Sequence, residues 1–292
     1  MRRLLVALGL LVSISGASAQ EYELPALRGS QPSMPTERAA STCCSRWGGF
    51  YTGGQVSHSS MNADFGKGVG DLAGFLVRNS VLEAPVSSWT TLPSGSTNAA
   101  GYGVFFGYNS VWEELILGWE INYTHTSLNV GSADSLSRSF ASDGGVPPGH
   151  HFVYDVTVSG NANIRVTDLL MFRGRAGWTV GNFLPYAFLA PGVARADVTR
   201  AATVGFTRTD YPDVTTPPTD PILPNPETFP PVTKTDIKNG GYYFAYAGGI
   251  GLDVEVMPRV FARFEWETLQ IPNVQGMKVG IQNVRTGLGL KF

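Results

Sequence analysis

The chain has 292 residues, of which 15% are charged and 11% aromatic, and its net charge is −2. This composition excludes a disordered chain, shows no basic excess for nucleic acid, and offers too few cysteines for a disulfide framework. Past residue 20, no apolar run reaches the roughly 18 residues that a membrane helix needs. A glycine-rich and aromatic-rich all-β chain is therefore the expected class.

The N-terminus has the features of a secretory signal peptide over residues 1–19. Arg2 and Arg3 provide the positive start, Leu4–Ile14 is the apolar core, and Ala17–Ala19 is a small-residue cleavage pattern. We therefore expect an exported protein.

Residues 20–46 are polar and proline-containing, without periodicity, and are predicted to be a flexible periplasmic extension. Cys43 and Cys44 close this segment. A disulfide between sequence neighbours would be strained, so two incidental thiols or an intermolecular link are expected instead. No cofactor or metal site is predicted, and residues 47–292 are left for the folded domain.

From Trp47 onward, apolar and polar residues alternate with period two, which is typical of strands with unlike faces. Most of these segments exceed the about 9–11 residues with which a tilted strand crosses a bilayer. The segments are 49–61, 100–109, 114–128, 164–180, 184–197, 240–256, 259–269 and 280–292.

The alternation is compatible with two kinds of closed eight-stranded barrel. A soluble, lipocalin-like barrel has its apolar face inside, whereas a membrane barrel has it outside. In the sixth segment, for example, Tyr242 and Phe244 share one face while Asp253 and Glu255 share the other. The first segment is weakly patterned, and neither phase separates the residues of the fifth.

The lengths of the connections favour the membrane barrel. Tight links are predicted at Ser110–Trp112, Gly181–Phe183 and Met257–Pro258, whereas long loops are predicted over 62–99, 129–163 and 198–239, and a shorter one over 270–279. Short turns alternating with long loops are typical of periplasmic turns and extracellular loops.

The aromatic residues fall in two bands, as expected at two membrane interfaces. The predicted periplasmic band contains Trp47, Phe50, Tyr51, Tyr108, Trp112, Trp178, Phe183, Tyr186 and Phe292. The other band contains Tyr123, Tyr242, Tyr243 and Trp266.

The C-terminal strand ends on an aromatic residue. Arg285, Gly287, Leu290 and Phe292 form a pattern that resembles the signal read by the outer-membrane assembly machinery. We predict this machinery as a partner, and an eight-stranded antiparallel transmembrane β-barrel with long extracellular loops and short periplasmic turns as the fold.

Ten charged residues are predicted to face the lumen, with equal numbers of acids and bases. Because eight strands leave an interior just wide enough for side chains, cross-strand ion pairs that plug the barrel are expected rather than a selective channel. The predicted lumen charge network is Glu120, Arg173, Arg175, Asp253, Glu255, Arg263, Glu265, Glu267, Arg285 and Lys291.

Several stretches resemble the small outer-membrane barrel proteins of alphaproteobacteria, the 25/31-kDa family of the OmpA-like barrel superfamily. They are Arg46–Gly53, Gly101–Asn109, Arg173–Trp178, Leu184–Tyr186 and Val284–Phe292. The resemblance implies an abundant protein that stabilises the envelope and meets the host or environment through its loops. Some relatives are reported to bind haemin, and the family implies no catalytic residues.

Three polar features allow more specific interpretations, which are weighed here against simpler ones. His125 and Ser127 share one face, as in outer-membrane lipid A deacylases, but no acidic partner is evident and interfacial polar residues are the simpler interpretation. His150–His151 could ligate haem, although solvated loop residues fit them better. Asp168 falls on the predicted lipid face near the extracellular end, where an acid is tolerated or a bulge changes the phase.

The sequence thus predicts a non-enzymatic outer-membrane barrel with a structural and surface-interaction role. Its expected partners are outer-membrane lipid, lipopolysaccharide, the assembly machinery and an unidentified extracellular molecule. A small-solute porin and a haem-binding surface protein are the alternatives. The proline-rich segment Tyr211–Pro231 is predicted to be extended and polyproline-like.

Overall fold

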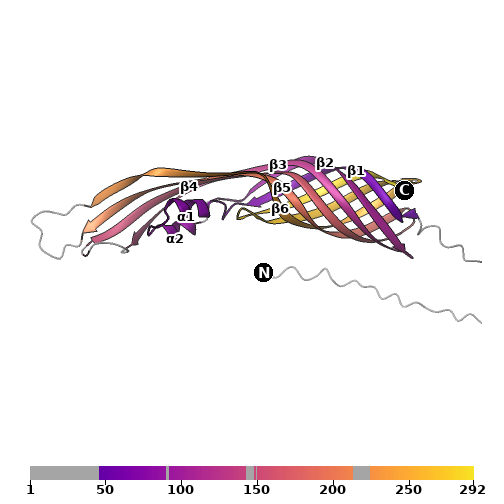
Figure 1. The fold of residues 1–292 in the computed structure, drawn as a ribbon, viewed down its shortest axis with the longest axis horizontal. Coiled ribbons are helices and arrows are strands. Elements are labelled where there is room, and N and C mark those ends of the chain that lie inside the picture. Colours follow the sequence, from indigo (N-terminus) through magenta and orange to yellow (C-terminus); the bar gives the residue numbers. More distant parts are fainter. Residues whose placement is uncertain (1–45, 90–91, 143–147, 149, 213–223) are drawn as a thin grey trace, which may run out of the picture. The chain divides into compact units, whose positions relative to one another are not determined.

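A computed structural model of the chain describes residues 46–89, 92–142, 148, 150–212 and 224–292. In these residues, eight strands form a closed barrel in which each strand pairs with the next and β8 returns to β1 (Figure 1). All neighbouring strands are antiparallel. The predicted eight-stranded antiparallel barrel is confirmed. The predicted signal peptide, and Cys43 and Cys44, lie outside the described residues.

The strands differ greatly in length, because β3 to β6 continue well beyond the others. Their bounds are β1 Gly49–Asp64, β2 Gly95–Trp112, β3 Leu115–Ser142, β4 His150–Trp178, β5 Phe183–Pro212, β6 Asn225–Met257, β7 Val260–Val274 and β8 Met277–Lys291. Two short helices, α1 Gly70–Leu76 and α2 Glu83–Ser87, lie between β1 and β2. Neither described helix is long and apolar enough to cross a membrane.

Two of the predicted long loops are strands instead. Within 129–163, β3 and β4 pair as far as Ser142 and Phe152. Within 198–239, β5 and β6 pair as far as Asp210 and Asn225, and the described parts of the proline-rich segment belong to the ends of β5 and β6. Bulges between Val166 and Asp168 and between Ala196 and Val198 interrupt the pairing. A bulge adds one residue and changes the phase of the alternation, which is why the sequence pattern ended there.

The turns at the opposite end of the barrel are tight, as predicted. The structure moves one of them, because β2 continues through Ser110–Trp112 and the chain turns at Glu113, whose φ is 58°. The link between β7 and β8 is also shorter than predicted, since only Gln275 and Gly276 separate the two strands. We call the end with the β2–β3, β4–β5 and β6–β7 turns the short-turn end, and the other the hairpin end.

The outer surface of the barrel carries a continuous belt of exposed apolar side chains. Leu189 is 75% exposed, and Leu288 63%. The belt also includes Val104, Phe106, Ile121, Phe172, Phe244, Ile250, Phe264 and Trp266. An apolar surface of this extent is costly in water and favourable in lipid, so the face assignment of the membrane barrel holds and that of a lipocalin does not.

The interior is layered rather than uniformly polar. A floor cluster of buried apolar residues lies toward the short-turn end, and a larger upper cluster fills the hairpin end. The floor cluster consists of Trp47, Tyr51, Phe105, Ile116, Leu184, Tyr186, Phe188 and Phe261. Trp47, Tyr51 and Tyr186 were predicted in the periplasmic aromatic band and Tyr243 in the other, but all four are buried inside the barrel.

The layering explains why the fifth segment gave no clear phase. In β5, Leu184, Tyr186 and Phe188 point inward to the floor cluster, while Phe183 and Leu189 point outward. Both faces are therefore apolar, although the burial of the strand alternates regularly. Sequence periodicity detects a strand only where its two surroundings differ.

Candidate functional site

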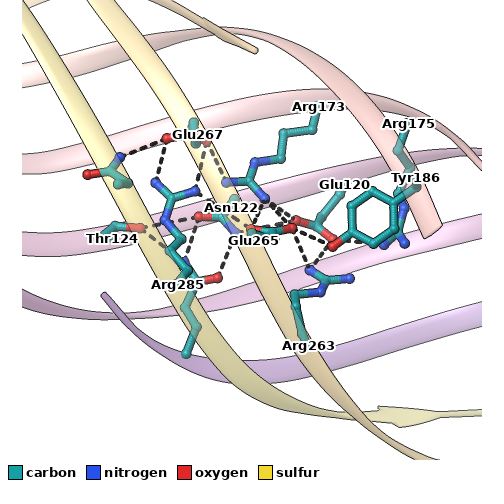
Figure 2. Close-up of polar contacts among 12 residues, drawn as sticks. Glu120, Asn122, Thr124, Arg173, Arg175, Tyr186, Arg263, Glu265, Glu267 and Arg285 are labelled. Atoms are coloured by element: carbon teal, nitrogen blue, oxygen red, sulfur yellow. Dashed lines mark hydrogen bonds and ion pairs between the residues drawn. The ribbon is translucent and has the colours of Figure 1, made fainter. Parts of the chain in front are cut away.

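Between the two apolar clusters lies a layer of buried ion pairs (Figure 2). We call it the charged layer. It contains four arginines and four acids, Glu120, Arg173, Arg175, Asp253, Arg263, Glu265, Glu267 and Arg285, and none is more than 4% exposed. These residues come from β3, β4, β6, β7 and β8. The layer is formally neutral, so each charge taken from water has an opposite charge beside it.

Arg263 connects two of the acids across the barrel. Its Nη1 donates to Glu120 at 2.6 Å, and its Nε donates to Asp253 at 2.9 Å. The other oxygen of Asp253 accepts from Arg175 at 2.8 Å. Since Arg263 is 0% exposed, water cannot replace either acid as its partner.

A second set of contacts continues the layer toward β8. Arg173 donates to Glu120 at 3.1 Å, to Glu265 at 2.9 Å and to Glu267 at 2.7 Å. Arg285 donates through both terminal nitrogens to Glu267, at 2.8 and 2.7 Å. Such two-point contacts fix the angle between donor and acceptor as well as their distance.

Neutral side chains extend the layer, and sequence reasoning did not assign Tyr51, Gln55 or Tyr186 to it. Tyr51 donates to Glu120 at 2.9 Å and accepts from Arg175, while Tyr186 donates to Glu265 at 2.6 Å. Gln55 and Asn122 exchange hydrogen bonds at 2.9 and 3.1 Å. The two tyrosines were placed in an interfacial band because they are aromatic. No sequence signal placed them inside, because the first segment is weakly patterned and neither phase separates the residues of the fifth.

Aromatic rings from the floor cluster cover the arginine side chains. The Arg175 guanidinium lies 3.8 Å from the ring centroid of Tyr186, and that of Arg263 lies 4.0 Å from Phe105. These distances are suited to cation–π attraction, which strengthens where water is excluded. The apolar floor therefore supports the charged layer directly.

Two of the ten predicted lumen residues lie apart from the layer. Lys291 and Glu255 form their own pair near the short-turn end, with Nζ and Oε1 3.4 Å apart. The Lys291 Nζ also lies 4.3 Å from the ring centroid of Trp47. The structure thus joins eight of the predicted residues and separates these two.

At the hairpin end, residues 65–89 and 92–94 form a loop segment that contains α1 and α2. Arg200 of β5, 5% exposed, reaches this segment from the barrel wall. Its Nη1 donates to the Gly68 carbonyl at 2.9 Å and to Asp71 at 3.1 Å, and its Nη2 donates to Asp236 at 2.6 Å. Leu72, Ala73 and Val86 are buried in the upper cluster. The loop segment is therefore packed into the barrel mouth. Because it contains two helices, the prediction of a long loop was wrong for this part of the chain.

An outward-facing polar group lies above the apolar belt, on β3 and β4. We call it the rim group. The His125 Nδ1 lies 2.9 Å from Asp168, and the Tyr123 hydroxyl donates to the same carboxylate at 2.7 Å. Asp168 faces outward as predicted, and a bulge lies directly before it. It is also the acidic partner of His125 that sequence reasoning did not find. Ser127 accepts from Arg165 at 3.4 Å.

His58 and His150 lie on different strands, β1 and β4. The Nδ1 of His150 lies 2.9 Å from Asp210 at the tip of the β4–β5 pairing. His58 lies on the outer face of β1. No group of three or more His, Cys, Asp or Glu side chains in the described ranges is placed to hold a metal ion.

The residues of the C-terminal pattern divide between the two faces of β8. Leu290 and Phe292 point outward, 51% and 75% exposed, whereas Arg285 is buried in the charged layer. A side chain at Gly287 would collide with the Gly54 carbonyl, since an added Cβ would lie 2.5 Å from that oxygen. Gly287 thus permits close packing of β8 on β1.

No model of a known protein family and no curated protein sequence matches the chain. Among solved structures, it is similar to Neisserial surface protein A, with 13% identity, 83% of this chain and 97% of that chain covered, and a TM-score of 0.35. It is also similar to Ail, the attachment invasion locus protein of Yersinia pestis, with 9% identity, 83% and 99% covered, and a TM-score of 0.29. Structural similarity this low adds no evidence for the fold, which the closed ring of paired strands already establishes.

The location follows from the barrel and its belt. A closed barrel satisfies every backbone group of its strands without water, and an outward apolar band matches a bilayer. Barrels of this form are proteins of the bacterial outer membrane. The chain is an outer-membrane protein.

Proposed function

We propose that the protein stabilises the outer membrane and presents a rigid β-sheet surface to the outside, without forming a channel. The observation that carries this proposal is the filled interior, where the charged layer lies between two apolar clusters. Every arginine of the layer contacts acids from other strands, so the layer cross-links the barrel wall. A protein built for conduction would keep such groups hydrated instead.

The extended hairpins support the surface role. Strands β3 to β6 pass far beyond the belt, and the outer portions of β3 and β6 carry mostly exposed side chains. We propose lipid and lipopolysaccharide as the partners of the belt, and the assembly machinery as the reader of Leu290 and Phe292. Membership of the alphaproteobacterial 25/31-kDa family remains part of the same proposal, on the resemblance of the strand sequences.

The first test is electrical. We expect the protein to be silent when it is inserted in a planar bilayer, because no continuous water path crosses the charged layer. Insertion is checked separately by gel mobility, since a closed barrel resists SDS until boiled and then migrates differently. Stable single-channel openings from inserted protein would favour the porin alternative and contradict the proposal.

A second candidate function rests on the rim group. The pairing of His125 with Asp168 supplies the base and orienting acid of a serine hydrolase, and Ser127 lies two residues away on the same face. In such a reaction, Ser127 would attack an ester carbonyl of a membrane lipid while His125 takes its proton. The ester C–O bond would then break, and the lipid alcohol would leave with the proton from His125, so that the acyl group stays on Ser127. Water would then release the acyl group as a carboxylic acid. Ser127 would first have to leave Arg165.

Lipid analysis separates this candidate from the main proposal. Purified protein is incubated with phospholipid and with lipid A in mixed micelles, and released fatty acid is measured. The structural proposal predicts no release above that of a Ser127→Ala variant. Release that disappears in both Ser127→Ala and His125→Ala, but persists in Tyr123→Phe, would establish the hydrolase instead.

A further inference from the structure

The outer half of β3 has a strand neighbour on one side only. On the β4 side it is paired as far as Ser142. On the other side, its ladder with β2 ends at Thr126. The hydroxyl of Ser132 donates to the Pro93 carbonyl at 2.8 Å, so the loop segment lies beside the strand at that point. Farther out, the Arg138 guanidinium lies 5.3 Å from the ring centroid of Trp89 in the loop segment, and residues 133–141 form an edge with no strand partner on this side among the described residues. We call this stretch the β3 edge.

The edge of β6 is also unpaired in its outer part, but its composition differs. The β6–β7 ladder begins only at Tyr246. The unpaired part of β6 contains Pro226, Pro230 and Pro231, which have no backbone N–H to donate, and it also carries the partly exposed Lys234 and the exposed Lys238. Prolines and lysines are the usual protection of an edge against pairing with another chain. The β3 edge contains neither, so it is the edge that is open to a further strand.

The side chains of the β3 edge are complementary to themselves. Asp134 and Arg138 lie on one face of the strand, two residues before and two residues after Leu136. An antiparallel partner strand centred on Leu136 would place each Asp134 opposite an Arg138 and the two leucines opposite each other. Opposite charges directly across a strand pair attract, and like charges repel. This symmetry is what a two-fold contact between identical chains requires.

We propose that the β3 edge docks with the β3 edge of a second copy of this chain, held in an apposed membrane. A two-fold axis that pairs two edges in an antiparallel manner stands perpendicular to the sheet. The axis therefore reverses the direction in which the sheet extends from its barrel. The two barrels then point toward each other, and the contact joins two membranes rather than two neighbours in one.

The length of the hairpin suits this arrangement. The stretch from Thr126 to Ala141 spans about 50 Å at ~3.3 Å per residue. Leu136, the centre of the contact, lies about 33 Å beyond the end of the β2–β3 ladder by the same rise. Figure 1 shows these strands continuing past the barrel. The inference deepens the surface role proposed above and rests on the outer-membrane placement.

Vesicle clustering tests the inference. The full barrel is inserted in phosphatidylcholine vesicles, and clustering is followed by light scattering. Wild-type vesicles are expected to cluster. Asp134→Arg and Arg138→Asp each replace two attractions of the symmetric contact by two repulsions. We expect each single variant to need about tenfold more protein for equal clustering.

The double variant Asp134→Arg/Arg138→Asp restores both pairs with the net charge of the wild type, and it is expected to cluster again. Lys238→Asp on the β6 edge makes the same charge change as Arg138→Asp and is expected to leave clustering unchanged. Dispersed wild-type vesicles, or a double variant no better than the singles, would overturn the inference. If the inserted protein is still electrically silent, the proposed function stands despite that failure.

Discussion

Replacing Arg263 by methionine is expected to lower the free energy of unfolding by about 3–5 kcal/mol, the cost of removing one partner from a buried ion pair. The substitution keeps an unbranched apolar side chain of similar length, so packing changes little. It leaves Glu120 and Asp253 with one cation fewer and gives the charged layer a net negative charge. Urea unfolding of the barrel in vesicles, followed by tryptophan fluorescence, measures the change.

Two further variants show whether the loss comes from unpaired buried charge. Arg195→Met removes a cation that is 51% exposed and 3.8 Å from Asp168, and it should change stability by less than about 1 kcal/mol. Arg263→Met/Asp253→Asn makes the layer neutral again and should unfold at higher urea than Arg263→Met alone. A loss no larger for Arg263→Met than for Arg195→Met would contradict the role given to the layer.

The outer face of the barrel could be predicted from the sequence because lipid imposes one rule on it. Residues such as Phe264 and Leu288 must be apolar wherever a strand crosses the bilayer, so alternation identified the eight segments and the outward phase of those with a clear pattern. Arg173 and Glu265 were then assigned to the interior because the lipid face excludes them. These inferences needed no knowledge of contacts between strands.

The inner face follows a different rule in each layer, and this limited what the sequence could predict. Tyr186 faces inward and Phe183 outward on the same strand, and only the neighbouring strands decide which is buried. The partner choices of Arg263 depend on the register of β3, β6 and β7, which the sequence does not reveal. The pairing of His125 with Asp168 was missed for the same reason, because it depends on the register that places the two residues opposite each other in the β3–β4 ladder.

The hairpins were missed because they leave the bilayer. Beyond the belt, the outward side chains are polar and the inward ones mix Val156 and Val158 with glycine and serine, so the contrast weakens. The bulge beside Asp168 also changes the phase. A strand outside lipid therefore gave the same sequence signal as a loop.

Arg200→Met is expected to release the loop segment from the barrel mouth, at a cost of about 2–4 kcal/mol. Arg200 is 5% exposed and holds Gly68, Asp71, Asp236 and the Gln275 carbonyl. The figure lies below that of a fully buried pair, because the side chains of Asp71 and Asp236 are 61% and 37% exposed. The variant should exchange backbone amide hydrogens faster in α1, and trypsin should cleave sooner at Lys67 and Arg78.

Arg165→Met, on the outer face of β4, is the matched control and should leave exchange in α1 unchanged. Arg200→Met also shows which feature closes the barrel. Because the charged layer does not involve Arg200, a barrel with a released loop segment should stay electrically silent. Openings in Arg200→Met, with none in the wild type, would mean that the loop segment closes the barrel and that the charged layer beneath it admits ions. Electrical silence of both Arg200→Met and the wild type would mean that the ion pairs close the barrel. Their arginines and acids belong to the strands and cannot move aside without opening the wall.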